Sequence, residues 1–118
     1  MRSKAFLEDG EWVGCYCYAS RHYRALLVLD QPVQGLFFKA RDDCGDGLVH
    51  LRAGGFDAIG SFQLVGTLEP STGDINIRKT YHGQRSRRWC GSLTPFGIVG
   101  SCNAYNAWFW LRKADWCR

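Results

Sequence analysis

The stretch of the sequence best equipped for chemistry is residues 78–89, Arg-Lys-Thr-Tyr-His-Gly-Gln-Arg-Ser-Arg-Arg-Trp, which holds five cationic side chains and no acidic one. Lys and Arg bind carboxylates and phosphates through charge-assisted hydrogen bonds. Cations interleaved with aromatic side chains such as Tyr81 and Trp89 are also typical of proteins that bind single-stranded nucleic acid. The direction of each side chain decides between these chemistries, and strand pairing sets that direction.

Two turns predict the pairing around this stretch. The turn over residues 70–73 contains a proline and a glycine and places Leu64 opposite Lys79 on neighbouring strands. A three-residue loop over residues 82–84 places Ile77 opposite Trp89, whereas a two-residue loop would place Ile77 opposite Arg88. Because a shift of one residue moves every side chain to the other face, the apolar match favours the three-residue loop.

This register divides the five cations between two faces. One face carries the apolar residues together with a candidate anion-binding set, Lys79, Tyr81, Arg85 and Arg87. Arg78 and Arg88 point to the opposite face, because neighbours in a strand alternate. We expect the first set at one end of the fold. Its anion is a carboxylate or phosphate of a ligand, an acidic group of a partner, or an internal Asp or Glu, and the sequence leaves these three open.

The elements that carry these residues are predicted to be β-strands. Apolar residues recur with a period of two, and 14 glycines against 3 prolines suit tight hairpin turns. Eight or nine short antiparallel strands indicate an all-β fold, a single small up-and-down β-barrel, with a β-sandwich as the alternative. We place an N-terminal arm at residues 1–10, the barrel at 11–113 and a C-terminal tail at 114–118. Within the barrel, near its N-terminal end, Gln-Pro-Val-Gln at 31–34 predicts a turn between two strands.

A run of three large aromatic residues, Trp108, Phe109 and Trp110, lies in the last predicted strand. Since side chains alternate along a strand, at least one of the three must face outward. Exposed aromatic residues are typical anchors of protein interfaces. We therefore predict an interface site at these three positions.

The charge and cysteine content exclude several protein classes. Residues 1–59 carry 7 Lys and Arg against 8 Asp and Glu, and residues 60–118 carry 8 against 3. The net charge of +4 therefore comes from the second half of the chain and marks a local cationic site. The start of the sequence lacks the apolar core of a signal peptide, so the six cysteines are expected as free thiols in an intracellular, non-secreted protein. Their spacing, like that of the three histidines, predicts no metal site, and no apolar run is long enough for a membrane span.

Two short motifs resemble the calycin pattern of lipocalins and fatty-acid-binding proteins: Gly10-Glu11-Trp12 at the head of the first strand, and Trp110-Leu111-Arg112 in the last. The resemblance implies an up-and-down barrel in which Arg112 packs across Trp12 and closes one end. The chain differs from fatty-acid-binding proteins because no two-helix lid follows the first strand, which argues against a deep, gated cavity.

The function predicted from these features is binding without catalysis. No nucleophile motif, phosphate loop or paired carboxylates indicate an enzyme, and no cofactor is expected. We expect a binding module or accessory subunit of a larger protein assembly, which uses exposed aromatics and a cationic barrel mouth. The alternative is a carrier of a small amphipathic anion inside the barrel. Nucleic acid is disfavoured as a partner because the cations are split between two faces.

Overall fold

The protein, described here by a computed structural model, is an all-β chain that forms a closed antiparallel barrel. The structure describes residues 3–19, 28–57, 59–83, 86–102 and 107–117. It contains a short helix, nine strands and a final 3-10 turn: α1 (Ser3–Glu8), β1 (Trp12–Ala19), β2 (Val28–Leu36), β3 (Lys39–Arg41), β4 (Val49–Phe56), β5 (Ser61–Leu68), β6 (Asp74–Tyr81), β7 (Ser86–Thr94), β8 (Gly97–Cys102), β9 (Ala107–Lys113) and η1 (Ala114–Cys117).

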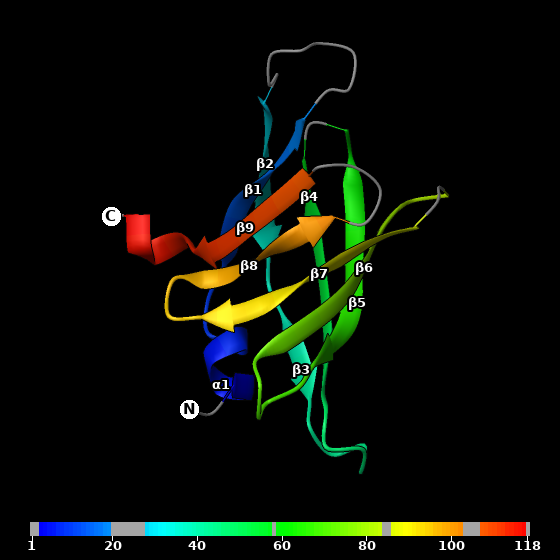
Figure 1. Cartoon of the computed structure of the whole chain (residues 1–118), viewed down its shortest axis with the longest axis vertical. Helices are drawn as coiled ribbons and strands as arrows, with labels where there is room; N and C mark the ends of the chain where they lie inside the picture. The colour runs from blue at the N-terminus through cyan, green and yellow to red at the C-terminus, as the bar shows by residue number, and fades with distance from the viewer. Residues whose placement is uncertain (1–2, 20–27, 58, 84–85, 103–106, 118) are drawn as a thin grey trace.

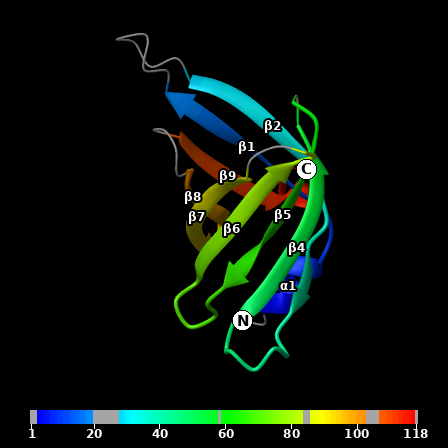
Figure 2. The same cartoon turned by 90° about the vertical axis from the view of Figure 1, so that its right-hand side faces the viewer.

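Eight of the strands form the barrel and one extends it. The strand order is β2-β1-β9-β8-β7-β6-β5-β4, and a pairing of Gln34 on β2 with Phe56 on β4 closes the ring. The short strand β3 adds to the outer edge of β4. Figures 1 and 2 show the strands curving around a common interior, with α1 near one end. The predicted all-β barrel is therefore confirmed.

The register around the cationic stretch is confirmed as well. Leu64 pairs with Lys79, Ile77 with Trp89, and Lys79 with Arg87. Alternate side chains on β6 and β9 are buried, which is the period-two pattern of a sheet with one face on the core. The inward positions therefore form one continuous core, whose largest fully buried side chains are Trp12, Trp89, Tyr16 and Phe109.

Glycines let neighbouring strands approach closely inside the barrel. A Cβ added to Gly66 would lie 2.0 Å from the carbonyl oxygen of Asn76, and one added to Gly91 would lie 2.1 Å from that of Val99. No heavier residue fits there without a backbone shift. These positions point inward, so their missing side chains allow the sheet to coil tightly.

The end of the barrel near α1 is closed by a lysine, not by the arginine that the calycin resemblance implied. Lys113 lies opposite Trp12, and its ammonium donates hydrogen bonds to the carbonyls of Phe6 and Asp9 at the end of α1. The same ammonium lies 5.4 Å from the Trp12 ring centroid. Arg112 is one residue out of phase, and its guanidinium lies over Trp110 at 4.8 Å on the outer face. The predicted Trp12–Arg112 contact is therefore wrong.

The predicted turn at residues 31–34 is also wrong, because this segment lies inside β2. Pro32 pairs with Cys15 of β1. On its other side, among the described residues, β2 is paired with β4 only at Gln34, so Pro32 lies where the strand is an edge. A proline cannot donate a ladder hydrogen bond, and an edge position does not require one.

Candidate functional site

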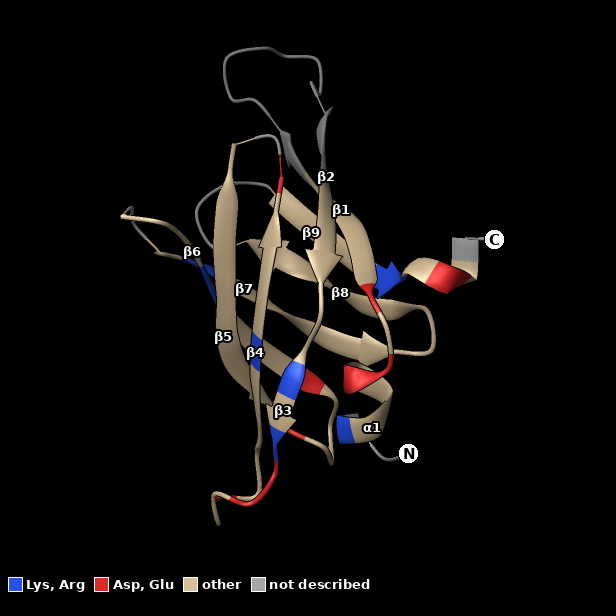
Figure 3. Ribbon diagram, turned by 180° about the vertical axis from the view of Figure 1, so that it is seen from behind, with Lys and Arg blue, Asp and Glu red and all other residues tan. Residues whose placement is uncertain are grey.

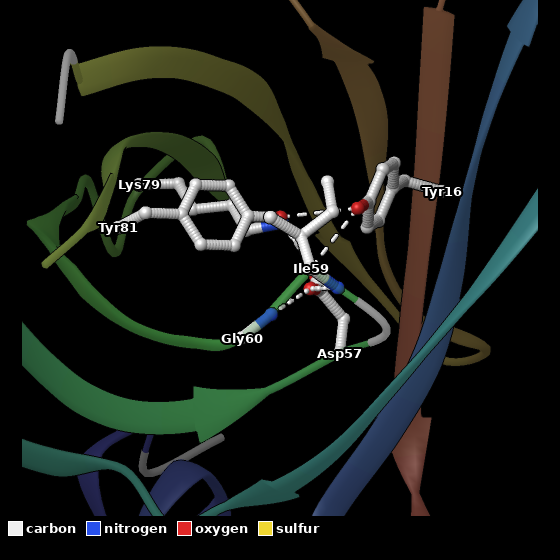
Figure 4. A network of polar contacts seen from close by, with 6 residues as sticks. All are labelled: Tyr16, Asp57, Ile59, Gly60, Lys79 and Tyr81. Atoms are coloured by element: carbon white, nitrogen blue, oxygen red, sulfur yellow. Dashed lines mark hydrogen bonds and ion pairs between the residues drawn. The ribbon is translucent and has the colours of Figure 1, made fainter.

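The lysine of the cationic stretch is buried inside the barrel, at the end opposite α1. Lys79 is 2% exposed, and its ammonium donates to Asp57 Oδ2 at 2.9 Å and to the hydroxyl of Tyr81 at 2.8 Å. The hydroxyls of Tyr81 and Tyr16 both donate to the same carboxylate oxygen, the latter at 2.9 Å. Figure 4 shows these side chains converging on Asp57 from β1, β6 and the loop between β4 and β5.

A cage of four aromatic rings surrounds the ammonium of Lys79. The ring centroids lie 4.0 to 4.9 Å from Nζ and belong to Tyr16, Phe62, Tyr81 and Trp89. Cation–π attraction is strongest where the cation is desolvated, as it is here. The rings replace part of the hydration that Lys79 loses on burial.

Burial and pairing act in opposite directions on the two ionised groups. Burial raises the pKa of Asp57, but hydrogen bonds from Tyr81, Lys79 and the amide of Ile59, together with the Lys79 charge, outweigh it and hold the pKa below its ordinary value. Burial also dominates at Lys79, where it lowers the pKa despite the hydrogen bond and charge of Asp57. The lowered pKa of Asp57 keeps its carboxylate ionised as the internal counter-ion, whereas burial weakens the hold of Lys79 on its proton.

The loop between β4 and β5 holds the carboxylate of Asp57 in place. Its other oxygen, Oδ1, accepts hydrogen bonds from the amides of Ile59 at 2.8 Å and Gly60 at 3.3 Å. The Asp57 amide in turn donates to the Gly60 carbonyl. Oδ2 alone therefore faces Lys79, and the Asp57 side chain is fully buried.

Sequence reasoning left an internal acid open but did not identify Asp57. The available signal was an Asp followed three residues later by Gly between two strands, which is a turn that an Asp side chain can cap. The structure thus brings Lys79 and Tyr81 together, as predicted, around an acid of the chain itself. The Asp57 carboxylate is paired with the Lys79 ammonium, and both of these side chains are buried, so the cluster supplies its own anion at this end of the barrel.

The other cations of the stretch lie at the barrel mouth and on its wall. Arg87 is opposite Lys79 in the ladder and is exposed. Arg78 and Arg88 pair with each other on the outer face and are exposed, as predicted. Arg85, the remaining member of the predicted anion site, lies outside the described residues.

An apolar surface lies on the outside of β8 and β9. We call it the aromatic surface and define it as Trp108, Trp110, Val99 and Phe96, whose side chains are 45%, 39%, 37% and 74% exposed. The Trp110 indole donates to the carbonyl of Phe96 at 2.7 Å. Two of the three predicted interface residues therefore face outward. Phe109 does not, because it is 1% exposed and stacks on Trp89 with a centroid distance of 4.5 Å.

The described thiols and acids provide no metal centre. Within the described ranges, no group of three or more His, Cys, Asp and Glu side chains could hold a metal ion. Cys15, Cys44, Cys90 and Cys102 are free thiols. Cys90 faces away from Cys102, as predicted, and donates to the side chain of Asn76. None of the described helices is long and apolar enough to cross a membrane.

Comparison with known proteins adds no identity to this geometry: no family model, curated protein or solved structure matches the chain.

Proposed function

We propose that this protein is a non-catalytic binding module that serves as an accessory subunit of a larger intracellular protein assembly. The observation that carries the proposal is the aromatic surface, on which Trp108 and Trp110 project side by side from the outer wall of β9. The module would dock a protein partner there. Its relation to calycins, suggested by the barrel and the Gly10–Trp12 motif, is part of the same proposal.

The aromatic surface has the properties of an interface anchor. Trp and Arg are enriched among the residues that dominate binding energy, and both are present here. Trp110 is fixed by its hydrogen bond to Phe96 and by the Arg112 guanidinium over its ring, so little side-chain entropy remains to be lost on binding. A partner with an apolar patch and a neighbouring carboxylate would match Trp110 and Arg112.

The geometry favours this function over a small-molecule carrier. The interior positions that could have lined a ligand cavity are filled by packed side chains, including the stacked pair Trp89 and Phe109. The two barrel ends are occupied by Lys79 with Asp57 and by Lys113 with α1. A ligand would have to displace a buried ion pair to enter, which costs several kcal/mol.

The test compares partner binding by three variants of the full chain. Trp108→Ser and Trp110→Ser each remove one anchor, and Phe37→Ser removes an exposed aromatic, 59% exposed, outside the aromatic surface. Proteins that co-purify with the native chain would be quantified by mass spectrometry. The leading one would then be purified and its affinity measured by calorimetry.

We expect the two Trp variants to weaken that affinity at least tenfold, while Phe37→Ser leaves it unchanged. Urea unfolding should shift little in all three, because the replaced side chains are substantially exposed. Equal losses in the Trp variants and in Phe37→Ser would overturn the proposal. So would light scattering that shows a native dimer which Trp108→Ser converts to a monomer, since the surface would then bind a second copy.

A further inference from the structure

Four cations form one row across the outer wall of the barrel. The ladder pairs Lys39 with Arg52, Arg52 with Val65, Val65 with Arg78, and Arg78 with Arg88. These five residues, which we call the cationic row, lie on β3, β4, β5, β6 and β7, and all are exposed. Figure 3, which views this side of the molecule, shows Lys and Arg on β3 and β4. The row contains the outward pair Arg78 and Arg88 of the cationic stretch.

The row places like charges directly opposite each other, which destabilises a sheet unless an anion is present. Elsewhere the exposed cations Lys4 and Arg41 have acidic partners at 2.8 and 3.1 Å. Within the described ranges, none of the four cations in the row has an ion pair within 4 Å. Glu8, near β3, pairs with Lys4 and with the amide of Ala40, and it acts on Lys39 only through a charge interaction beyond ion-pair distance.

The cations form two pairs separated by an apolar residue. Lys39 and Arg52 are one pair, Arg78 and Arg88 are the other, and Val65 lies between them with 48% of its surface exposed. Neighbouring strands are about 4.8 Å apart, so the centres of the two pairs are about 14 Å apart, three strand spacings, measured along the wall of the barrel. Two anions at that distance, with an apolar group midway, would match the row.

Two shallow grooves meet at this apolar residue. One groove is lined by Lys39 and Arg52, the other by Arg78 and Arg88, and both include Val65 and Gly66. The second groove also contains the hydroxyls of Thr80 and Ser86. The wall is thus hollowed along the row, on both sides of its centre.

We propose that the cationic row binds an extended, acidic polypeptide segment of the pattern acidic-x-apolar-x-acidic. An extended chain rises about 3.4 Å per residue, so acids four residues apart are separated by about 14 Å. The two acids and the middle apolar residue project to the same side, because side chains alternate. Each carboxylate then meets one cation pair, and the apolar residue meets Val65. This inference does not depend on the aromatic surface, which lies on β8 and β9.

The chemistry of the row favours a polypeptide over nucleic acid. Proteins that bind single strands without sequence preference stack bases on aromatic side chains. Among the residues that the structure describes, no Phe, Tyr or Trp lines either groove. The centre of the row is an aliphatic residue, which matches an apolar side chain better than a phosphate.

The experiment titrates the ¹⁵N-labelled full chain with synthetic peptides and follows amide shifts by NMR. The probe is acetyl-Gly-Glu-Ala-Leu-Ala-Glu-Gly-amide. One control peptide replaces both Glu by Gln, and a second places the two Glu three residues apart, which turns them to opposite sides of an extended chain. A twelve-nucleotide oligo-dT strand is the competing probe.

We expect the probe to shift amides of β3 to β7 and to bind at least fivefold more tightly than either control peptide. The variant Arg52→Gln/Arg78→Gln should weaken the probe at least tenfold. The single variant Arg78→Gln should weaken it at least threefold, whereas Arg87→Gln, which removes one exposed cation at the barrel mouth outside the row, should weaken it less than twofold. These variants replace side chains at the surface, and an unchanged urea midpoint verifies that they fold.

Three outcomes would overturn the proposal. Shifts that are absent or lie off these strands would remove the site. Equal losses in Arg78→Gln and Arg87→Gln would mean diffuse charge attraction. Tighter binding of oligo-dT than of the peptide, with a steep salt dependence and loss in Arg52→Gln/Arg78→Gln, would assign the row to nucleic acid.

Discussion

Replacement of Lys79 by Met tests whether the buried cluster holds the barrel end closed. The substitution keeps a long side chain but removes the ammonium that pairs with Asp57. The side chain of Asp57 is 0% exposed. Breaking a buried pair by removing one partner costs about 3–5 kcal/mol, because a buried charge is left uncompensated. Asp57 keeps hydrogen bonds from Tyr16, Tyr81 and two amides, so we expect the lower end, about 3 kcal/mol.

The assay is urea unfolding followed by tryptophan fluorescence. With a slope of about 1.5 kcal/mol/M, a loss of about 3 kcal/mol lowers the midpoint by about 2 M. Lys39→Met is the matched control, since Lys39 is exposed on β3, and it should change the unfolding free energy by less than about 0.5 kcal/mol. The double variant Lys79→Met/Asp57→Asn removes both charges, and its cost should fall short of the sum of the single costs by about 2 kcal/mol.

Acid titration adds an independent test of the same pair. The pKa of Asp57 in the folded protein is lowered, so its contribution to stability is fully present above the pKa of an unfolded Asp, about 3.9. That contribution is lost as the pH falls through the folded-state pKa. The stability gap between the native chain and Asp57→Asn should therefore be constant above about pH 5 and narrow below about pH 4. A cost of Lys79→Met equal to that of Lys39→Met, or single costs that simply add, would refute the reasoning.

Two further predictions concern the packing of the barrel. Gly66→Ala should lower the unfolding free energy by about 3 kcal/mol, since its Cβ would lie 2.0 Å from a carbonyl of β6, whereas Gly54→Ala, with 3.9 Å to its nearest atom, should cost little; similar urea midpoints would mean that the strands are not so close. Timed iodoacetamide labelling at pH 8, read by mass spectrometry, should modify exposed Cys44 at least a hundredfold faster than buried Cys102, whose pKa is raised by burial to about 11. Comparable rates would show that the barrel opens.

Sequence reasoning succeeded where the signals were local. The pairing of Leu64 with Lys79 and of Ile77 with Trp89 follows from short hairpin loops between neighbouring strands. A one-residue error in such a hairpin would expose the apolar residues, so the pattern selects one register. The outward direction of Arg78 and Arg88 followed from the same register.

Long-range closure and an ambiguous last strand account for the errors. In β9, aromatic or apolar residues stand at both the odd and the even positions. The sequence alone therefore does not decide which set faces inward, the one with Phe109 and Lys113 or the one with Trp110 and Arg112. The structure decides through the pairing of β9 with β1, which is distant in sequence. Pro32 was interpreted as part of a turn, although a strand tolerates proline where no ladder hydrogen bond is needed. Residue 32 meets that condition because β2 is an edge on the N-terminal side of Gln34, and this edge depends on how the barrel closes.

The two lysines that close the barrel explain why binding is expected on the wall. Lys79 and Lys113 lie at opposite ends of the interior, each among aromatic rings and each satisfied by acceptors of the chain itself. An ammonium that is buried and paired resists displacement, because a departing partner leaves a desolvated charge behind. The outer face of the barrel is open to partners, and there the aromatic surface and the cationic row lie on different strands.

Those two surfaces are close enough to serve one partner. Trp108 on β9 is in register with Ser101 on β8 and Cys90 on β7, and Arg88 lies two residues along β7 from Cys90, which places Arg88 about 12 Å from Trp108. Cys90 and Ser101 are small, so they leave the outer face between the two surfaces open. A partner that inserts an apolar group at Trp108 can therefore extend an acidic segment along the cationic row. Binding at the two surfaces would then be coupled, as in any bivalent contact. The strength of the coupling would depend on the length of the partner's chain between its apolar group and its acidic segment.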